Sequence, residues 1–579
     1  MLPAEKQIFM QRVRSLKRIV ERVQNGPAAA TNAVLSLWQA RSYPALQKTN
    51  SKKIDGLTNV QQIGDLAIWL AERPFLESAF WLSSAYSIWV GDDVRSKKSL
   101  YFTPPILAER LIDNLVSQGA SFTKHVWMDP ACGGGAFLAP VAVRMIQALK
   151  QQGATPSTII KHLSKSLVGN DIDSVLADLA EQFLRMALYG QILECKHEPV
   201  FKISIGDGLI PEISEENKFD VLICNPPYRK MKADEVNGYK PKYADVIEGQ
   251  PNMYGLFIRQ CLAIGKKGAI VGLLTPTSYL SGQNFSKLRT RILVESDVCQ
   301  IDLVDDRMGI FIGVSQGAVL TVYKLLKITG AIRPPTEVYA LSRTGEFTHV
   351  GTCQFPKSGL AWPVPRNTGD EGIIAGAGKS LYRLKDFGYT ARIGTYVDYR
   401  DTRKTYANQP NNKTMKAVFP IIWSSDVTSA GQLIHGRTSK EDKHHTFIEM
   451  GDPSHAAIVR RPCIALQRVT SPDQPRRLVC APVNDDFIHR HGGVVGENHV
   501  IFLEQSSDGC ALSPAELAAV LGSKQVDRLF RSISGAVNVS VFELNQLPLP
   551  NPMLLAEYLQ LGRSLDDAVN RAFLQGITH

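Results

Sequence analysis

A predicted strand that ends in an acid and turns through three glycines carries the clearest chemical signal in the sequence. Residues 126–138 read Val-Trp-Met-Asp-Pro-Ala-Cys-Gly-Gly-Gly-Ala-Phe-Leu. Glycines at such a turn let backbone N–H groups approach a ligand without a Cβ in the way. A phosphate-binding loop would continue with Gly-Lys-Ser or Gly-Lys-Thr, whereas this loop has no basic residue and begins with Asp129. A carboxylate repels a pyrophosphate and suits an ammonium or sulfonium group, which favours S-adenosylmethionine as the ligand; a structural Gly-rich turn is the alternative.

Acidic residues also follow the next two predicted strands. Strand 166–171 ends in Asp171, and strand 201–205 is followed by Asp207. Asp171 stands where a ribose diol would need an acceptor, and Ile172 beside it can pack on an adenine face. Acids at strand ends are often helix caps, but three in succession are harder to explain by capping.

The fourth predicted strand, 219–224, leads into Asn225-Pro226-Pro227-Tyr228. Two prolines fix the backbone and have no N–H to donate, so the carbonyls of the turn are free to accept. Asn225 adds a side-chain acceptor and Tyr228 a stacking face. These groups fit a planar primary amine, with two acceptors for its N–H groups and a ring along its π-face. A tight turn with a buried tyrosine is the alternative.

A sheet is needed to bring these strand ends together. From about residue 96 to residue 330, predicted helices alternate with short apolar strands, which indicates an α/β domain with a mostly parallel sheet. Ligands bind at the carboxyl ends of such strands. Residues 1–95 read as a helical N-terminal region, because apolar residues recur at helical spacing. Residues 331–579 contain Pro-rich joints, short strands and a few late helices, which predicts a separate α+β domain.

Composition and charge exclude several classes of protein. Of the 579 residues, 44% are hydrophobic and 21% are charged, as is typical of a globular chain. No run approaches the ~18 consecutive apolar residues of a membrane span, and the first residues lack the apolar core of a secretory signal. Nine cysteines without a Cys-x-x-Cys pair indicate neither a disulfide framework nor a cysteine zinc site. We therefore expect a cytoplasmic protein.

Basic residues are concentrated in two parts of a chain whose net charge is +10. Residues 1–54 contain ten Lys and Arg against two acids, and residues 391–480 contain fourteen against eight. Basic flanks around a near-neutral centre favour a polyanion as the partner, held by the flanks while the centre does the chemistry. A merely solvated basic face is the alternative.

The motifs Asp-Pro-Ala-Cys-Gly-x-Gly and Asn-Pro-Pro-Tyr resemble those of amino-methyltransferases that act on N6 of adenine in DNA. The order of segments resembles the gamma class of restriction–modification methyltransferases. In that class a Thr-Pro segment precedes the Gly-rich loop, and a target-recognition domain follows the catalytic domain. Here Thr103-Pro104 lies about twenty-five residues before the Gly-rich loop that begins at Asp129. The resemblance covers roughly residues 95–579.

The resemblance implies a Rossmann-like methyltransferase domain at 96–330 and a target-recognition domain at 331–579. The implied reaction moves a methyl group from S-adenosylmethionine to N6 of an adenine flipped out of duplex DNA. The residues that would hold the donor are Thr103, Asp129, Ala131, Gly133, Gly135, Asp171, Ile172 and Asp207. Those at the target base would be Asn225 and Pro226 as acceptors, Pro227 within the turn, and Tyr228 and Phe311 as stacking rings. The reaction needs no metal.

Basic residues near the proposed base pocket and in the last domain are candidates for DNA contacts. The polar segment 229–251, which we expect to be a loop, interleaves basic and aromatic residues. Arg and Gln in the last domain can contact phosphates or base edges. The candidates are Arg229, Lys230, Lys232, Arg461, Arg468, Arg476 and Arg477. His444-His445 and the pair His489 and His491 have no cysteine or acidic cluster at ligand spacing, so we expect solvated histidines there and no metal.

Three alternatives stay open. Asn-Pro-Pro-Tyr also occurs in enzymes that methylate protein glutamine or RNA bases, although these usually lack a long C-terminal domain with a basic stretch. A catalytically degenerate DNA-binding subunit would share the fold without the reaction. Cytosine N4 is a further acceptor, because the turn recognises an amine rather than a particular ring. Any cognate restriction endonuclease is expected to be a separate polypeptide.

Overall fold

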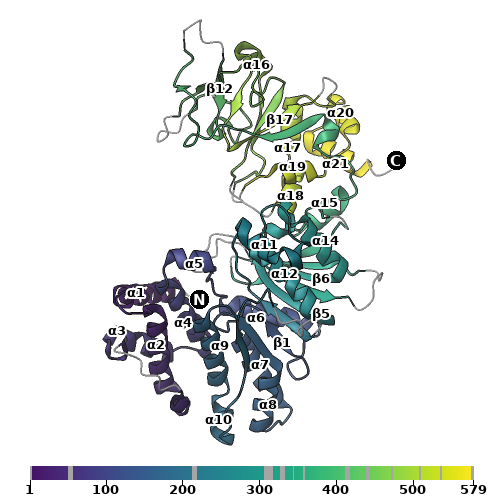
Figure 1. Ribbon diagram of the computed structural model, residues 1–579. Helices are drawn as coiled ribbons and strands as arrows, with labels where there is room; N and C mark the ends of the chain where they lie inside the picture. Colours follow the sequence, from purple (N-terminus) through teal and green to yellow (C-terminus); the bar gives the residue numbers. More distant parts are fainter. Residues whose placement is uncertain are drawn as a thin grey trace. The chain divides into compact units, whose positions relative to one another are not determined.

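A computed structural model describes most of the chain, with gaps in both halves (Figure 1). The described residues are 3–49, 57–210, 218–304, 317–326, 333–342, 344–356, 359–410, 417–437, 444–470, 474–506, 510–534 and 538–575. They form two compact units. The first comprises Met1–Pro276 and Asn284–Thr348, and the second comprises Thr277–Gln283 and His349–His579.

A nine-stranded sheet has the order β3-β2-β1-β4-β5-β7-β6-β8-β9. Its first eight strands belong to the first unit, whose boundary falls within β9. The strands from β3 to β5 all run parallel, β7 runs antiparallel to both neighbours, and β6 and β8 are parallel. The predicted α/β class with a mostly parallel sheet is therefore confirmed. The strands are β1 (Trp127–Asp129), β2 (Leu167–Asp171), β3 (Lys202–Ile205), β4 (Phe219–Cys224), β5 (Gly265–Pro276), β6 (Ser296–Val304), β7 (Ala318–Leu325), β8 (Thr336–Leu341) and β9 (Phe347–Cys353).

Helices connect and cover these strands. In β4 only Asp220 is not fully buried, as expected for a strand inside a sheet covered on both faces. Helix α6 packs on β5 and β7, α9 packs on β2 and β3, and α12 packs on β5. The longer helices are α6 (Pro105–Ser117), α7 (Leu138–Gln151), α8 (Pro156–Ser166), α9 (Ser174–Ala187), α11 (Ala233–Tyr243), α12 (Met253–Ile264) and α14 (Ser286–Glu295).

The N-terminal helices share a hydrophobic core with the sheet domain. They are α1 (Pro3–Val20), α2 (Gly26–Ser42), α3 (Gln61–Ala71), α4 (Phe75–Trp89) and α5 (Asp92–Lys98). A single buried apolar cluster runs from Phe9 on α1 through the helices of the sheet domain to Leu341 on β8. The helical region predicted for 1–95 exists, but it is part of the first unit rather than a separate body.

The second unit contains two four-stranded sheets and several helices, so its predicted α+β class is confirmed. The sheets have the orders β10-β17-β14-β15 and β11-β13-β12-β16. Their strands are β10 (Tyr389–Ile393), β11 (Thr405–Tyr406), β12 (Val418–Ile422), β13 (Phe447–Glu449), β14 (Cys463–Gln467), β15 (Cys480–Val483), β16 (Val495–Gly496) and β17 (Val500–Gln505). The helices are α13 (Ser278–Ser281), α15 (Asp370–Ala377), α16 (Asp485–His491), α17 (Pro514–Leu521), α18 (Lys524–Ile533), α19 (Val541–Gln546), α20 (Pro552–Gln560) and α21 (Leu565–Gln575).

The predicted boundary at residue 330 needs correction. The catalytic domain does not end at residue 330, because β8 pairs with β6 and β9 extends the same sheet. The unit boundary lies instead between Thr348 and His349, and the short segment 277–283 belongs to the second unit. There the backbone N–H of Trp362 donates to the Leu280 carbonyl at 2.7 Å, and the Ser281 hydroxyl donates to Glu543 at 2.9 Å.

The segment expected to be a loop at 229–251 contains helix α11. The Glu235 carboxylate accepts the Lys232 backbone N–H at 2.9 Å, which satisfies a donor at the start of the helix. Pro241 lies near the other end, and the helix ends two residues later. The sequence of this segment predicts a loop because it is polar and contains proline, which breaks a helix when it lies in the helix interior. Helix α8 and the short α10 (Tyr189–Cys195) were not predicted either.

Candidate active site

The carboxyl ends of β1, β2 and β4, together with the turn after β3, open onto one cavity of about 240 Å³. This convergence is what the parallel order of the four strands requires. The sequence-predicted residues that line the cavity are Thr103, Asp129, Ala131, Gly133, Asp171, Ile172, Asp207, Asn225, Pro227 and Arg229. Gly135 lies beside it, in the wall of a smaller adjoining cavity.

Asp129 is the most deeply buried charged group of the cavity, with 1% of its surface exposed. One carboxylate oxygen accepts the Ala131 backbone N–H at 3.0 Å. Burial raises the pKa of Asp129 to about 8, although the Ala131 hydrogen bond opposes this shift. A carboxylate in so poorly solvated a position is stabilised by a cation, so Asp129 suits an ammonium or sulfonium group.

The Gly-rich loop needs glycine where it turns toward the cavity. Gly133 has a φ of +51° and Gly135 a φ of +73°, values that L side chains rarely adopt. The Gly133 backbone N–H donates to one oxygen of Asp171 at 2.8 Å, and the backbone N–H of Asp173 donates to the other at 2.9 Å. These bonds fix the loop after β1 against the turn after β2. Ile172, at the tip of that turn, is 71% exposed and free to cover a flat ligand.

Asp207 accepts a hydrogen bond from a segment that the sequence did not place at the cavity. One of its oxygens accepts the Leu209 backbone N–H at 2.9 Å, and the other accepts the hydroxyl of Tyr239. Tyr239 lies on α11 and lines the cavity, whereas the sequence assigned its segment to DNA contacts. Burial and the Asp207 carboxylate raise the pKa of Tyr239, which keeps the hydroxyl a donor at neutral pH.

Asn225 lines the cavity, and its side chain has one acceptor with which no described residue pairs. Its Nδ2 donates to the Thr103 hydroxyl at 3.0 Å and to the Tyr101 carbonyl at 3.3 Å. Its Oδ1 is buried and has no hydrogen-bond partner among the described residues. Thr103, which we predicted to contact the methyl donor, is 2% exposed. Its hydroxyl accepts from Asn225 and so helps to orient the Asn225 amide. A buried carbonyl oxygen without a partner is costly unless a ligand supplies a donor.

The other residues of the Asn-Pro-Pro-Tyr turn differ in their relation to the cavity, whose lining does not include Pro226 or Tyr228. Pro226 is buried and Pro227 lines the cavity. The Tyr228 hydroxyl donates to the Leu274 carbonyl at 2.9 Å, and its ring meets that of Tyr254 edge-on at 6.1 Å. Burial raises the pKa of Tyr228 well above its ordinary value. Phe311, predicted as the second stacking ring, lies outside the described residues.

Arg229 is not an exposed basic residue of a free loop. Its guanidinium makes a two-pronged ion pair with Glu235, at 2.9 and 2.7 Å, and lines the cavity. Lys230 and Lys232 are exposed. Their position beside the cavity is compatible with the predicted DNA contact, which stays a prediction.

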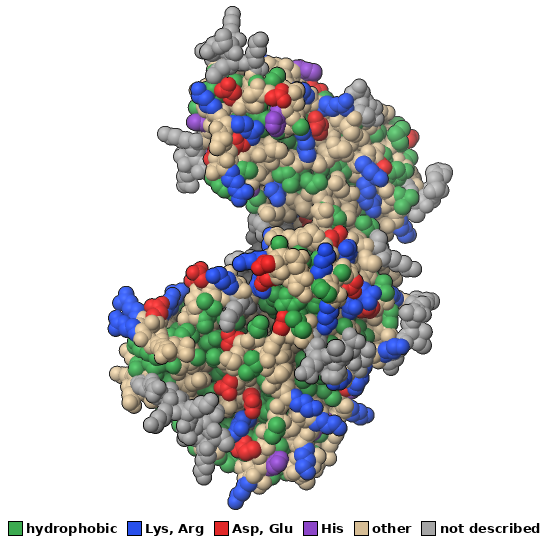
Figure 2. All heavy atoms as spheres, in the orientation of Figure 1, with side chains coloured by type: hydrophobic (Ala, Val, Ile, Leu, Met, Phe, Trp, Pro, Cys, Tyr) green, Lys and Arg blue, Asp and Glu red, His purple; other side chains and the backbone are tan. Residues whose placement is uncertain are grey.

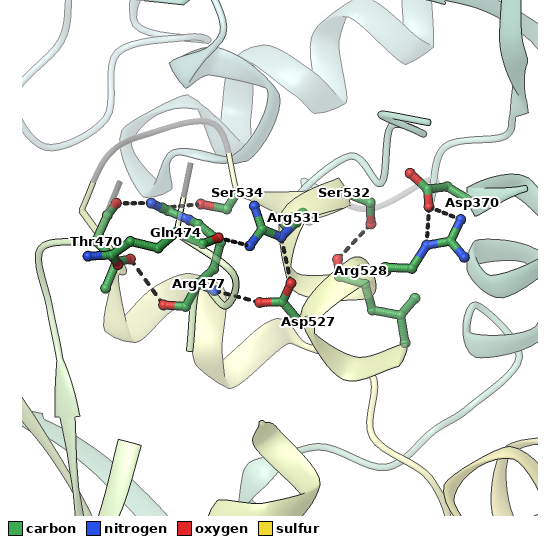
Figure 3. Close-up of polar contacts among 10 residues, drawn as sticks. Asp370, Thr470, Gln474, Arg477, Asp527, Arg528, Arg531, Ser532 and Ser534 are labelled. Atoms are coloured by element: carbon green, nitrogen blue, oxygen red, sulfur yellow. Dashed lines mark hydrogen bonds and ion pairs between the residues drawn. The ribbon is translucent and has the colours of Figure 1, made fainter. Parts of the chain in front are cut away.

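The second unit arranges its four candidate arginines differently. Arg461 and Arg476 are exposed, and half-buried Arg468 donates to the Asn498 carbonyl at 3.0 Å. Arg477 is 2% exposed, and burial lowers its pKa to about 10. Its guanidinium donates to the Thr470 carbonyl and the Ser534 hydroxyl within the unit (Figure 3). The predicted DNA contact of Arg477 is therefore wrong, because its buried guanidinium forms hydrogen bonds inside the unit.

Basic residues of the N-terminal region lie on the outer side of α1. Phe9, Val13 and Leu16 face the core and are fully buried, while Arg14 and Arg18 are exposed. Figure 2 shows Lys and Arg side chains gathered over the α1 end of the first unit. The helical spacing of the charges and of the buried residues thus separates the two faces, as the sequence predicted.

Two kinds of feature are absent from the described residues. No helix there is both long and apolar enough to cross a membrane. Within the same residues, no three or more His, Cys, Asp or Glu side chains are grouped so that they could hold a metal ion.

Comparison with known proteins relates part of the chain to methyltransferases of restriction–modification systems. Residues 80–311 match the Eco57I restriction-modification methylase family. Two curated type II methyltransferases are similar in sequence. M.BstVI of Geobacillus stearothermophilus is 22% identical over 200 residues, and M.BanIII of Aneurinibacillus aneurinilyticus is 23% identical over 220 residues. The resemblance to restriction–modification methyltransferases is thereby confirmed for this part of the chain.

The aligned parts are limited. The two alignments cover 32% and 36% of this chain, and 35% and 36% of M.BstVI and M.BanIII. The chain thus aligns with about a third of the length of these curated relatives. The structure of the type IIL restriction–modification enzyme MmeI in complex with DNA has a TM-score of 0.54 and 11% identity, covering 89% of this chain and 80% of that one. This likeness shows that the two proteins share a fold.

Several residues of the cavity were missed by sequence reasoning. Tyr101 and Asp173 flank predicted site residues, and Tyr239 lies in the segment assigned to DNA. The proximity of Tyr101 to Thr103 in the sequence was the only available signal for its role at Asn225. Asp173 and Tyr239 act through contacts with distant segments, which no local pattern indicates.

Proposed function

We propose that this chain is an S-adenosylmethionine-dependent DNA methyltransferase of a restriction–modification system, acting on N6 of an adenine flipped out of the duplex. The observation that carries the proposal is the buried Oδ1 of Asn225, which has no hydrogen-bond partner among the described residues. Asn225 lines the same cavity as the strand-end acids. A hydrogen-bond acceptor that is held in place and has no hydrogen-bond donor among the described residues fits an amine substrate. The strand-end acids of the same cavity fit a cationic methyl donor.

The donor side of the cavity fits S-adenosylmethionine residue by residue. Asp129 would accept from the ammonium group of the donor, and Asp171 and Asp207 from its ribose and adenine. The exposed Ile172 would cover the face of the adenine. When bound, S-adenosylmethionine supplies a methyl group on a sulfonium, which is a good leaving group. The protein's task is then to hold the acceptor nitrogen in line, because orientation alone can supply several kcal/mol of the barrier.

Asn225 and the Pro226 carbonyl would act on the target amine. The lone pair of an adenine amine is delocalised into the ring, which makes the nitrogen a poor nucleophile. Accepting both N–H groups favours a pyramidal nitrogen and stabilises the positive charge that develops on it. Thr103 and Tyr101 support this role, since they accept the two hydrogen bonds of Asn225 Nδ2 and so fix the position of Oδ1. Asn225 is not a base, so the extra proton leaves after transfer.

Duplex DNA is the acceptor that best explains the rest of the chain. Reaching the amine requires extrusion of the base, at a cost of a few kcal/mol. Tyr228 and Phe311 would stack on the base, while Lys230, Lys232, Arg461, Arg468 and Arg476 would contact the DNA. The names of the relatives support the same class: two are type II methyltransferases, and the MmeI structure contains DNA.

A methyl-transfer assay with three acceptors tests the proposal. The full chain and methyl-labelled S-adenosylmethionine are incubated with duplex DNA, RNA or protein, and modified nucleosides are identified by mass spectrometry. We expect label in DNA as N6-methyladenine. N4-methylcytosine would move the acceptor to cytosine, and label in RNA or protein would overturn the DNA assignment. Donor binding without transfer to any acceptor would identify a catalytically degenerate subunit.

A further inference from the structure

Helix α4 of the N-terminal helical region forms part of the wall behind the Gly-rich loop. Eleven of its fifteen residues are buried, and it contacts both the other N-terminal helices and α9 of the sheet domain. A Cβ placed on Gly134 would lie 2.2 Å from the Ser83 hydroxyl oxygen and 3.1 Å from the Ser83 Cβ. The Gly-rich loop therefore lies directly against α4, with no room for one additional methyl group.

The same helix reaches the turn after β2. The Tyr86 hydroxyl lies 3.1 Å from each oxygen of the Asp173 carboxylate, and both residues are 5% exposed. Asp173 caps α9 by accepting the Val175 backbone N–H at 3.1 Å, and its own backbone N–H donates to Asp171 at 2.9 Å. Tyr86 thus anchors one end of the turn that carries Asp171 and Ile172, the two residues assigned to the donor nucleoside.

The hydroxyl of Tyr86 is not needed to fill space in the core. Residues around Tyr86 on α4 are apolar or small, and phenylalanine would fill the same volume without burying a hydroxyl. A hydroxyl that donates to a carboxylate makes a charge-assisted hydrogen bond, which is stronger than a bond between neutral groups and more directional than an apolar contact. The polar group is placed against Asp173, which is itself a cavity-lining residue.

We propose that Tyr86 and Ser83 are positioning residues for the donor, so that α4 makes the N-terminal helical region a working part of the donor site. Tyr86 fixes the turn after β2, and Ser83 fixes the backbone of the Gly-rich loop from behind. This inference rests on the proposed function, because it takes S-adenosylmethionine as the ligand. It adds a role for the N-terminal region that the strand-end residues by themselves do not imply.

The first test is the variant Tyr86→Phe in the full chain, with donor affinity measured by titration calorimetry in the absence of DNA. We expect the Kd for S-adenosylmethionine to rise about tenfold, while kcat at saturating donor and the affinity for duplex DNA stay within about twofold of wild type. The matched control is Ser78→Ala, which removes another buried hydroxyl of α4 that donates to the Leu70 carbonyl at 2.7 Å, away from the cavity. This control should bind the donor as wild type does.

A second test uses compensation across the contact. Gly134→Ala should weaken donor binding about tenfold, because Gly134 does not have a left-handed φ and the added methyl group fails only for lack of space. Adding Ser83→Gly to that variant should restore most of the affinity, because the added methyl group then takes the space that the serine side chain leaves. Ser83→Gly by itself should weaken donor binding a few-fold, because the Gly-rich loop loses the side chain that supports it. Thermal unfolding without ligand identifies any variant that is merely unstable.

The outcomes separate this inference from the proposed function. If the wild-type chain binds no S-adenosylmethionine, the proposed function fails. If the wild type binds the donor but Tyr86→Phe binds equally well and Ser83→Gly does not rescue Gly134→Ala, the function stands and the positioning role of α4 is wrong. A parallel loss of affinity and thermal stability in Ser78→Ala would also overturn the inference, since any damage to α4 would then suffice.

Discussion

The two halves of the cavity differ in how their polar groups are satisfied. On the donor half, Asp129, Asp171 and Asp207 each already accept hydrogen bonds from the protein. On the target half, Asn225 donates twice but keeps an acceptor without a partner among the described residues. The donor half, which we propose binds S-adenosylmethionine, is therefore fixed by hydrogen bonds within the protein. The target half, which we propose binds the amine, keeps one acceptor available for its substrate. Preorganisation of this kind suits a site that holds its donor before the extruded base arrives.

The halves also differ in electrostatics. Asp129 has its pKa raised to about 8 by burial, so its charged form becomes stable when a cation binds. Asn225 is neutral at any pH and acts through orientation alone. Changes on the donor half should thus alter binding and its pH dependence, while changes on the target half should alter turnover.

Removing the unpaired acceptor should have the largest effect. Asn225→Ala is expected to lower kcat by about 10²–10³, the usual cost of losing one preorganised hydrogen-bonding group at a developing charge. The Kd for S-adenosylmethionine should stay within about twofold of wild type. Single-turnover methyl transfer and calorimetry measure the two quantities. A comparable loss in donor affinity would mean that the two halves do not work separately.

Neutralising the buried carboxyl should break the donor half. In Asp129→Asn the shape is kept but the charge is lost, and a hydrogen bond to a charged group is worth about 1.5–3 kcal/mol. We expect the donor Kd to rise about 10- to 100-fold, with a smaller change in kcat at saturating donor. Asp113→Asn is the matched control, because Asp113 is exposed and pairs with Arg144 on the surface. Equal effects of the two variants would remove Asp129 from the donor site.

Donor affinity should depend on pH through the same group. Because the pKa of Asp129 is raised to about 8, the carboxyl of the empty site is protonated below that pH and must lose its proton to pair with a cation. Affinity should therefore rise by up to about tenfold per pH unit from pH 6 to 8 and level off above. Calorimetry in buffers of different ionisation enthalpy should detect close to one proton released. Asp129→Asn should abolish this slope.

Tyr239 should have the smallest effect. Tyr239→Phe removes the hydroxyl that Asp207 accepts and should raise the donor Kd only a few-fold, because the Leu209 backbone N–H still holds the carboxylate. Turnover at saturating donor should not change. Tighter donor binding would instead show that the hydroxyl competes with the donor for Asp207.

Much of the cavity could be predicted from short stretches of sequence. Asp129, Asp171 and Asn225 each end or follow a strand, and parallel strands place such positions at one edge regardless of the details of packing. The turn at Asn225-Pro226 could also be predicted from adjacent residues, since proline has no backbone N–H to donate. These predictions needed only the order of the elements.

Predictions that depended on three-dimensional surroundings did less well. Arg477 was assigned to DNA because it is charged and follows another arginine, but Thr470 and Ser534 enclose it inside the second unit. Segment 229–251 was assigned to a loop because it is polar and contains proline, but α11 packs its Tyr239 onto Asp207. A charge or a polar run has the same sequence pattern whether it faces solvent or another segment.

The sequence by itself determined which groups stand at the strand ends and which ligand charges they suit, because strand and turn chemistry is set by neighbours along the chain. Tertiary structure alone decided that Thr103 aims Asn225, that Tyr239 holds Asp207 and that Tyr86 holds Asp173. These pairs are separated by 122, 32 and 87 residues. Such contacts arise when packing brings distant segments together, and no local propensity encodes them.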